Sequence, residues 1–514
     1  MLRKIINTAV ILVFLFLSLA ILANSMTKSI GHDEQMFCTA AVLTAQGKII
    51  YRDFSYVVHL PYHPLLCAFF FKAFNTTHYL LTARIISSLC DILVVLCILA
   101  VYRRIFDSYP IEGWLFGLAA AILYVFNPLV DYANGYAWNN DVVTACVMLS
   151  YWLFISTDFK HKSRYWWTAA IGALLTFATF MRITTVLVQL LFFLVLIIQS
   201  VGPVKQRLKD ALPFLIATIA VSIWPVWIIA LAPRAFFLNV FRIPVLNSKW
   251  LHQMGMVYSK LHLTLISITT PGYFVLIVIA IYLCVILLWK RSKLTVSNAI
   301  KPLLAPLLTL TFIIIAFIPP TIWMQYLAMP VPFLIISFSY PLLYLRKLSR
   351  QTGCGNHFNI ASALVAVCVF VAVIFFPAVP GRIPMLFKPQ SWVPVQLHRI
   401  SEDIAKETKS PKLILTLAPL YALEGRCDIY PQLASSPFVY RVADLMTASD
   451  LKTVKAVGPK TLKTLLEDSP PSAVILGVEF EFLEAPLFQM TVQPDRKNWE
   501  ERIYENGPLV YFRR

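Results

Sequence analysis

Long apolar segments recur along the first 377 residues and are separated by short polar connections. A bilayer core requires about 20 apolar residues per helix, so this pattern predicts a mainly α, polytopic bundle of about 11 membrane spans. The predicted spans cover residues 5–23, 79–102, 113–130, 139–156, 165–181, 185–200, 211–231, 269–289, 301–319, 322–345 and 358–377.

The first apolar segment follows Arg3 and Lys4 and admits two interpretations. Small residues at 22–25 would suit cleavage as a signal peptide, but the apolar core is longer than the roughly 7–15 residues of such peptides, which favours a retained anchor. A polar and aromatic first loop then occupies residues 24–78. Within it Leu65–Phe74 is apolar but too short to span, and predicts a juxtamembrane helix in the interface.

Basic clusters orient the predicted spans. Cytoplasmic connections of membrane proteins are enriched in Lys and Arg, and placing the N-terminus inside puts a basic cluster on every predicted inner connection. An odd number of spans then places the C-terminus outside, in the periplasm if the host is a bacterium with an inner membrane. The clusters are Arg103-Arg104, Lys160/Lys162/Arg164, Lys205/Arg207/Lys209, Lys290-Arg291-Lys293 and Arg346-Lys347/Arg350.

The chain changes character after Pro377. Repeated prolines in residues 378–394 interrupt helices and indicate a linker. Residues 395–514 then predict a small extracytoplasmic α/β or α+β domain, with strands at 412–417 and 473–476 and a helix at 450–466.

Composition supports a membrane protein and excludes several other classes. Hydrophobic residues make up 59% of the chain and charged residues only 14%, against about 25% in soluble domains, which excludes a cytosolic enzyme, a disordered chain and a small secreted scaffold. The net charge of +18 belongs to the connections and does not indicate nucleic acid. Nine scattered cysteines without a CxxC pair predict packing residues, and the lack of a Walker A motif argues against an ATP-driven pump.

An acidic pair, Asp33-Glu34, lies just beyond the first span, at the predicted start of a short helix that runs to Gln46. Unpaired backbone N–H groups and the helix dipole stabilise a carboxylate there. One interpretation is therefore structural, with Asp33 capping the helix and Glu34 solvated; the other is a catalytic pair.

Three short motifs accompany this pair: Gly47–Phe54 (GKIIYRDF), His59–Leu66 (HLPYHPLL) and Trp323–Leu334 (WMQYLAMPVPFL). Together with the span pattern, they resemble the GT-C class of membrane glycosyltransferases. That class includes dolichol-phosphate-mannose-dependent protein O-mannosyltransferases, related bacterial proteins and the aminoarabinose transferases of lipid A. The resemblance covers about residues 1–377, and a tail segment at 415–441 is similar to the outer domain of some bacterial members.

The resemblance implies transfer of a hexosyl or pentosyl group from a polyprenyl-phosphate donor to a hydroxyl of a glycolipid, polysaccharide or protein. It implies a GT-C-like bundle with juxtamembrane helices, and inversion in a single displacement at the outer face. Asp33 would be the base and Glu34 would support or orient it; a carboxylate within hydrogen-bond reach of the acceptor suits that task.

Six further residues are predicted contacts of the donor phosphate or sugar, and the alternatives for them stay open. Arginine can hold phosphate through two hydrogen bonds, yet Arg182 at a span end can equally extend to the interface. Asp53 could pair with Arg52 or Arg182, or join the acidic cluster. The six are Arg52, Asp53, Arg84, Asp141, Arg182 and Tyr326.

No cofactor is expected. Asp33, Asp53 and Asp141 offer oxygen ligands for Mg²⁺ or Mn²⁺, and some members of the class use a metal, but metal independence is the favoured prediction. The competing function is a non-enzymatic transporter or flippase of lipid-linked sugars. A transporter would predict inverted repeats and broken helices near the midplane, and neither is evident in the sequence.

Overall fold

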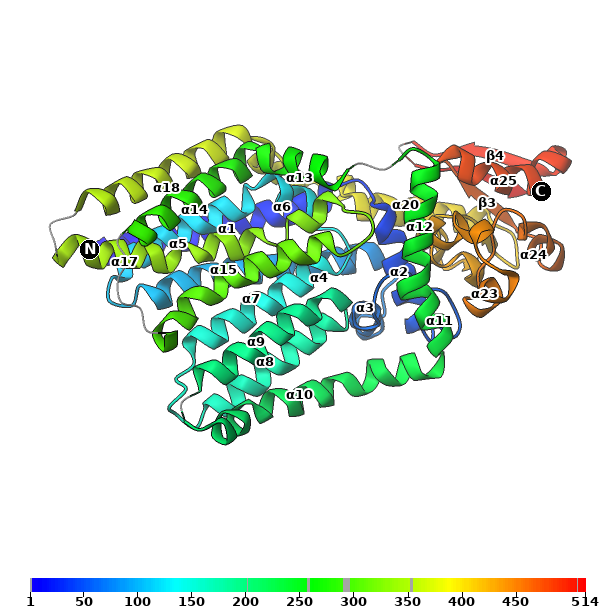
Figure 1. The fold of residues 1–514 in the computed structure, drawn as a ribbon. Coiled ribbons are helices and arrows are strands. Elements are labelled where there is room, and N and C mark those ends of the chain that lie inside the picture. Colours follow the sequence, from blue (N-terminus) through cyan, green and yellow to red (C-terminus); the bar gives the residue numbers. More distant parts are fainter. Residues whose placement is uncertain (1, 201, 257–258, 290–295, 352–354, 506) are drawn as a thin grey trace.

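The computed structural model describes residues 2–200, 202–256, 259–289, 296–351, 355–505 and 507–514. A bundle of long helices forms most of the molecule, and a smaller domain sits at one end of it (Figure 1). The long helices are α1 (Leu2–Thr27), α4 (Tyr79–Ile105), α5 (Pro110–Val125), α7 (Asn140–Ser156), α8 (Arg164–Thr179), α9 (Val186–Gln199), α10 (Val204–Leu231), α14 (Pro271–Trp289), α15 (Val296–Phe317), α17 (Ser339–Gln351) and α18 (Gly355–Phe375).

Each predicted span corresponds to a helical segment, and the described residues include six helices that are long and apolar enough to cross a membrane. Several other bundle helices, such as α5 and α7, are apolar but shorter. The prediction of a mainly helical bundle is confirmed, whereas the count of about 11 spans stays a prediction.

The span predicted at 322–345 is divided. A 3₁₀ turn, η3 (Met324–Leu327), precedes α16 (Val331–Ser337) and α17. Pro330 and Pro332 lack the N–H that would continue a helix from η3, so the helix is interrupted within a stretch, Met324–Arg350, that as a whole is long and apolar enough to cross a membrane.

The first loop folds into two short helices at the end of the bundle next to the C-terminal domain (Figure 1). These are α2 (His32–Ala45) and α3 (Tyr62–Ala73), so the helix expected at 65–74 forms. A further set of helices connects α10 to α14: α11 (Pro233–Phe237), the π-helix η2 (Leu238–Arg242), α12 (Ile243–Gln253) and α13 (Lys260–Thr269). Helix α12 crosses the junction between the bundle and the C-terminal domain.

Three short turns at Ala378–Gly381, Ile383–Phe387 and Pro389–Ser391 occupy the proline-rich linker, and α20 (Val393–Glu407) follows. The C-terminal domain contains a five-stranded mixed sheet of order β2-β1-β3-β5-β4. Strand β1 pairs in parallel with β2 and β3, while β5 is antiparallel to β3 and β4, so an α/β-type domain forms as expected. The strands are β1 (Leu413–Leu415), β2 (Asp428–Ile429), β3 (Ala473–Leu476), β4 (Trp499–Ile503) and β5 (Leu509–Arg513).

The prediction of a single helix at 450–466 is wrong. Two helices form there, α23 (Ala448–Thr453) and α24 (Leu462–Asp468). Between them Lys455 has φ of +53°, and Gly458-Pro459 cannot continue a helix.

The N-terminus lies at the end of the bundle that is remote from the C-terminal domain (Figure 1). Arg104, Lys160 and Arg164 lie at that same end, at the C-terminus of α4 and around the start of α8. The basic cluster Lys290-Arg291-Lys293 lies outside the described residues.

Candidate active site

The acidic pair opens helix α2, but the two carboxylates have different surroundings. Gly31, in extended conformation, is the N-cap, and the Glu34 carboxylate accepts a hydrogen bond from the Gly31 N–H at 2.8 Å. The prediction that Asp33 caps the helix is therefore wrong, because the third helical residue, Glu34, supplies the acceptor.

Glu34 forms an ion pair with Arg84 of α4 in which both side chains are fully buried. The Arg84 Nε and Nη2 groups donate to the two carboxylate oxygens at 2.8 and 2.7 Å, and the Ala137 N–H donates at 2.6 Å. A solvated Glu34 is thus excluded. These hydrogen bonds connect α2 to α4 and to the loop before α7, so Glu34 has a structural role next to Asp33.

Arg84 has no N–H group left for a phosphate. Its remaining three donors bind the carbonyl oxygens of Ser25, Lys28 and Ser29 at 2.8 to 3.0 Å. These carbonyls belong to the end of α1 and the residues after it, so Arg84 satisfies backbone groups that the helix end leaves unpaired. The donor contact predicted for Arg84 is not supported by this geometry.

Asp33, by contrast, is partly exposed, and among the described residues its carboxylate has no hydrogen-bond partner. Although part of the residue is exposed, its carboxyl is shielded from water, and this desolvation raises its pKa from 3.8 to about 6, while the nearby cation Arg441 opposes the rise. A carboxylate with a pKa near 6 is still mostly ionised at pH 7 and is a stronger base than a solvated one.

Arg182 lies in the turn between α8 and the 3₁₀ turn η1 (Ile183–Thr185) and is 8% exposed. Its Nη1 donates to Asn140 Oδ1 at 2.9 Å, and its guanidinium lies 4.5 Å from the ring centre of Tyr326 on η3. Arg182 and Asp33 both interact electrostatically with the Tyr326 hydroxyl. Tyr326 on η3 therefore contacts Arg182 of the α8–η1 turn and lies within electrostatic range of Asp33 on α2.

His59 lies near Arg182 in the candidate site. Its Nδ1 contacts Asn139 Nδ2 at 3.2 Å, and its ring packs on Phe37 of α2 with centroids 4.6 Å apart. Burial, together with the charge of Arg182, lowers the pKa of His59 to about 3, so the ring is neutral. It can accept or donate a hydrogen bond without adding charge.

Arg52 and Asp53 pair with each other through hydrogen bonds of 2.9 Å, and the Ile49 N–H also donates to Asp53 at 2.7 Å. Of the alternatives for Asp53, the structure shows the pairing with Arg52. The Arg52 side chain is 48% exposed, and this pair closes a surface turn.

Asp141 is fully buried at the start of α7 and accepts a hydrogen bond from the Gly135 N–H at 2.9 Å. Gly135 has φ of +84° and packs so closely on Ser25 that a Cβ would lie 3.1 Å from its backbone. Asp141 thus holds this tight loop, and the predicted sugar contact is not supported by its burial.

Arg441 is a site residue that the sequence did not single out. It lies in the C-terminal domain, stacks near Trp250 and Phe438, and donates from Nε to Asn247 at 2.8 Å. Burial lowers the pKa of Arg441 to about 10, while the charges of Asp33 and Glu479 oppose that decrease. Its segment, SSPFVYR, resembled the family's outer domain, which was the one available signal.

The C-terminal domain is held against α2 and α4 by polar contacts. His32 Nδ1 lies 3.0 Å from Glu479, and the Gln35 side chain accepts from the Leu420 N–H at 3.1 Å. Glu424 accepts from the Leu80 N–H, the first turn of α4, at 2.7 Å. These contacts fix the position of Arg441 relative to Asp33.

The three carboxylates considered as metal ligands do not gather. Asp53 is paired with Arg52, Asp141 Oδ2 accepts from the Gly135 N–H, and among the residues that the structure describes no three His, Cys, Asp or Glu side chains form a group that could hold a metal. Metal independence stays a prediction, and no step below uses a metal.

Comparison with solved structures identifies the fold. ArnT from Cupriavidus metallidurans, solved bound to undecaprenyl phosphate, matches with a TM-score of 0.60 over 99% of this chain and 97% of that chain, at 13% identity. The chain has the GT-C fold. The GT-C resemblance drawn from the acidic pair and the span pattern is thus confirmed at the level of the fold, and the apolar helices support a multi-pass membrane protein.

Two other comparisons agree with this GT-C assignment. The Archaeoglobus fulgidus oligosaccharyltransferase, solved with a tethered acceptor peptide, matches with a TM-score of 0.52 at 11% identity over 98% of this chain and 74% of that chain. The sequence model of the dolichyl-phosphate-mannose-protein mannosyltransferase family matches residues 58–229. No curated protein sequence matches significantly.

Proposed function

We propose that this GT-C protein transfers a sugar from a polyprenyl-phosphate donor to a hydroxyl acceptor at the outer membrane surface. The single observation that carries the proposal is that the two carboxylates of the acidic pair have different surroundings. Glu34 forms a buried ion pair with Arg84. Asp33 beside it is partly exposed, has a raised pKa and has no hydrogen-bond partner among the described residues. Such a carboxylate is suited to accept a proton.

The proposed reaction is a single displacement with inversion. The acceptor oxygen forms a bond to the anomeric carbon as the bond from that carbon to the phosphate oxygen breaks. Asp33 takes the proton of the acceptor hydroxyl, and the lipid phosphate leaves with the bonding electrons. One base is enough, because a phosphate leaves without strong protonation.

Cations at the site would stabilise the leaving phosphate. Arg182, beside Tyr326, is one candidate, because among the described residues only its Nη1 has hydrogen-bond partners, the Asn140 amide and the Met329 sulfur. Arg441 is the second candidate and would join from the C-terminal domain. Arg52 is the weakest, since its guanidinium is already paired with Asp53 at the surface.

The lipid-linked donor is inferred partly from relatives. ArnT was solved with undecaprenyl phosphate and the archaeal enzyme with dolichol phosphate and an inhibitory peptide. We infer a polyprenyl-phosphate hexose or pentose as donor and a lipid, polysaccharide or protein as acceptor. The inferred location is a bacterial inner membrane, with the N-terminus cytoplasmic and the C-terminal domain periplasmic.

The test uses purified full-length protein in lipid nanodiscs with radiolabelled polyprenyl-phosphate sugars. Transfer appears as a new glycosidic product and free polyprenyl phosphate. Comparing the glycans of a deletion strain with its parent would identify the acceptor. Movement of lipid-linked sugar across liposomes without any new glycosidic bond would support a flippase and overturn this proposal.

Orientation has its own test. A cysteine at Lys48, exposed in the first loop, should react with a membrane-impermeant maleimide added from outside. A cysteine at Lys160, exposed at the opposite end of the bundle, should react only after permeabilisation. The reverse pattern would place the proposed site in the cytoplasm and contradict the proposal.

A further inference from the structure

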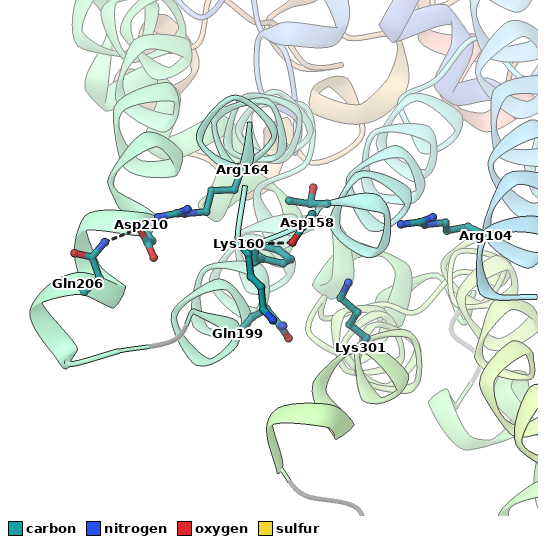
Figure 2. Close-up of a pocket in the computed structure, with 10 residues that line it drawn as sticks. Arg104, Asp158, Lys160, Arg164, Gln199, Gln206, Asp210 and Lys301 are labelled. Carbon is teal, nitrogen blue, oxygen red and sulfur yellow. Dashed lines mark hydrogen bonds and ion pairs between the residues drawn. The ribbon is translucent and has the colours of Figure 1, made fainter. Parts of the chain in front are cut away.

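A cavity lies at the end of the bundle that is remote from Asp33. Its volume is about 600 Å³, within the range of roughly 300–1,000 Å³ of small-molecule sites. The ends of α4, α7 and α9 and the beginnings of α8, α10 and α15 surround it, and its charged side chains converge from different helices (Figure 2). The charged lining residues are Arg104, Asp158, Lys160, Arg164, Asp210 and Lys301.

One acid–base pair in the cavity is internally satisfied. Asp210 accepts from Arg164 at 3.1 Å, from Ser200 Oγ at 2.5 Å and from Gln206 Nε2 at 3.0 Å. Its carboxylate is therefore fully occupied and compensates one cation. The Arg164 Nε, however, is buried and has no hydrogen-bond partner.

Three further cations line the cavity, and the described residues provide no ion pair within 4.0 Å for any of them. Lys301 Nζ donates to the Ile155 carbonyl at 3.4 Å and lies 5.7 Å from the centre of the Phe159 ring. Asp158 is the one other carboxylate, so the lining carries an excess of two positive charges. Lys301 is repelled by Arg104 and attracted by Asp158. A bound anion would relieve the remaining repulsion between the cations of the lining.

The positive-inside rule explains why this end of the bundle is basic, but it requires only charge in the connections. It does not require side chains from separate helices to converge on one cavity. A buried, unpartnered guanidinium N–H and uncompensated cations in one cavity are the features of an anion site.

We propose that this cavity binds a phosphate group, presented either by the headgroup of an anionic lipid or as a free anion. Arg104, Lys160 and Lys301 would neutralise the phosphate, and Arg164 Nε would donate to one of its oxygens. In the orientation inferred above, the cavity opens at the cytoplasmic leaflet. The site is separate from the proposed chemistry at Asp33 and does not depend on it.

The test measures binding of two probes to the purified full-length protein in neutral detergent. Short-chain phosphatidic acid carries a lipid phosphate, and inorganic phosphate carries the same group without acyl chains; short-chain phosphatidylcholine is the neutral reference. The double variant Arg104→Gln/Lys301→Gln should weaken phosphate binding about a hundredfold, since each lost charge-assisted contact is worth roughly a factor of ten.

Arg103→Gln is the matched control. It removes the same charge one position away on α4, where the side chain pairs with Asp107 and does not line the cavity. Arg103→Gln should bind like wild type, and Lys301→Arg should retain binding because it keeps the charge. If the double variant does not fold, Arg104→Gln alone serves, because Arg104 is exposed.

Binding of phosphatidic acid alone would identify a lipid headgroup site, and binding of both probes would identify a general phosphate site. Absence of binding of either probe to wild type would overturn the proposal. Equal loss in Arg103→Gln and in the double variant would overturn it as well, because it would show only a surface charge effect.

Discussion

Replacement of Glu34 by glutamine tests the assignment of this residue to the scaffold. The Glu34 carboxylate accepts four hydrogen bonds, two from Arg84 and one each from the Gly31 and Ala137 N–H groups. Glutamine keeps the shape but has one acceptor oxygen, and its NH₂ group would face a donor. Arg84, which is fully buried, would keep an uncompensated charge. Removing one partner of a buried pair costs about 3–5 kcal/mol, so Glu34→Gln should lower the free energy of unfolding by about 3 kcal/mol.

The assay is reversible unfolding in mixed micelles with increasing SDS, followed by tryptophan fluorescence. Asp33→Asn is the control, because it changes the adjacent carboxylate, which has no partner among the described residues, and should leave stability unchanged or slightly higher. A Glu34→Gln protein as stable as wild type would refute the scaffold role. The double variant Glu34→Gln/Arg84→Gln should be less destabilised than the sum of the single variants, since either change already breaks the pair.

Three further predictions concern catalysis. The kcat/KM of transfer, measured by initial rates, should rise with pH through an apparent pKa near 6. The reason is that Asp33 acts as base only when deprotonated and its pKa is raised to about 6. A profile that is flat from pH 5 to pH 8 would contradict this prediction. Arg441→Gln should move that acidic limb to higher pH, because the Arg441 charge lowers the Asp33 pKa, whereas Arg52→Gln, which changes an exposed pair, should leave it in place. Prolonged treatment with EDTA should leave the transfer rate unchanged; loss of activity restored by Mg²⁺ or Mn²⁺ would contradict metal independence.

The sequence predicted the bundle well because a bilayer imposes a simple rule of length and apolarity. Every apolar run of suitable length became a helical segment. Helices are interrupted where local backbone chemistry overrides apolarity, as at Pro330 and Pro332 within the span predicted at 322–345. The same holds at Gly458-Pro459, which divides the helix predicted at 450–466.

The candidate site was predicted only in part. The position of Asp33-Glu34 followed from its place after the first span, but the division of roles between them did not. That division depends on Arg84, 50 residues away, whose side chain folds back onto Glu34 rather than toward a donor. Arg441 could not be predicted, since it reaches Asp33 only because α12 and the C-terminal domain dock there. Pairing of Asp53 with its neighbour Arg52 was one of the open alternatives, because it needs no tertiary information.

The most direct test of the central claim is sugar transfer by Asp33→Asn protein in nanodiscs, compared with wild type and with Asp53→Asn. The account predicts that Asp33→Asn folds normally and loses transfer by about 10²- to 10⁴-fold, the usual contribution of a general base. Asp53→Asn, in the surface turn of the same loop, should retain most of the activity. Wild-type transfer by a well-folded Asp33→Asn protein would remove Asp33 as the base and contradict the account.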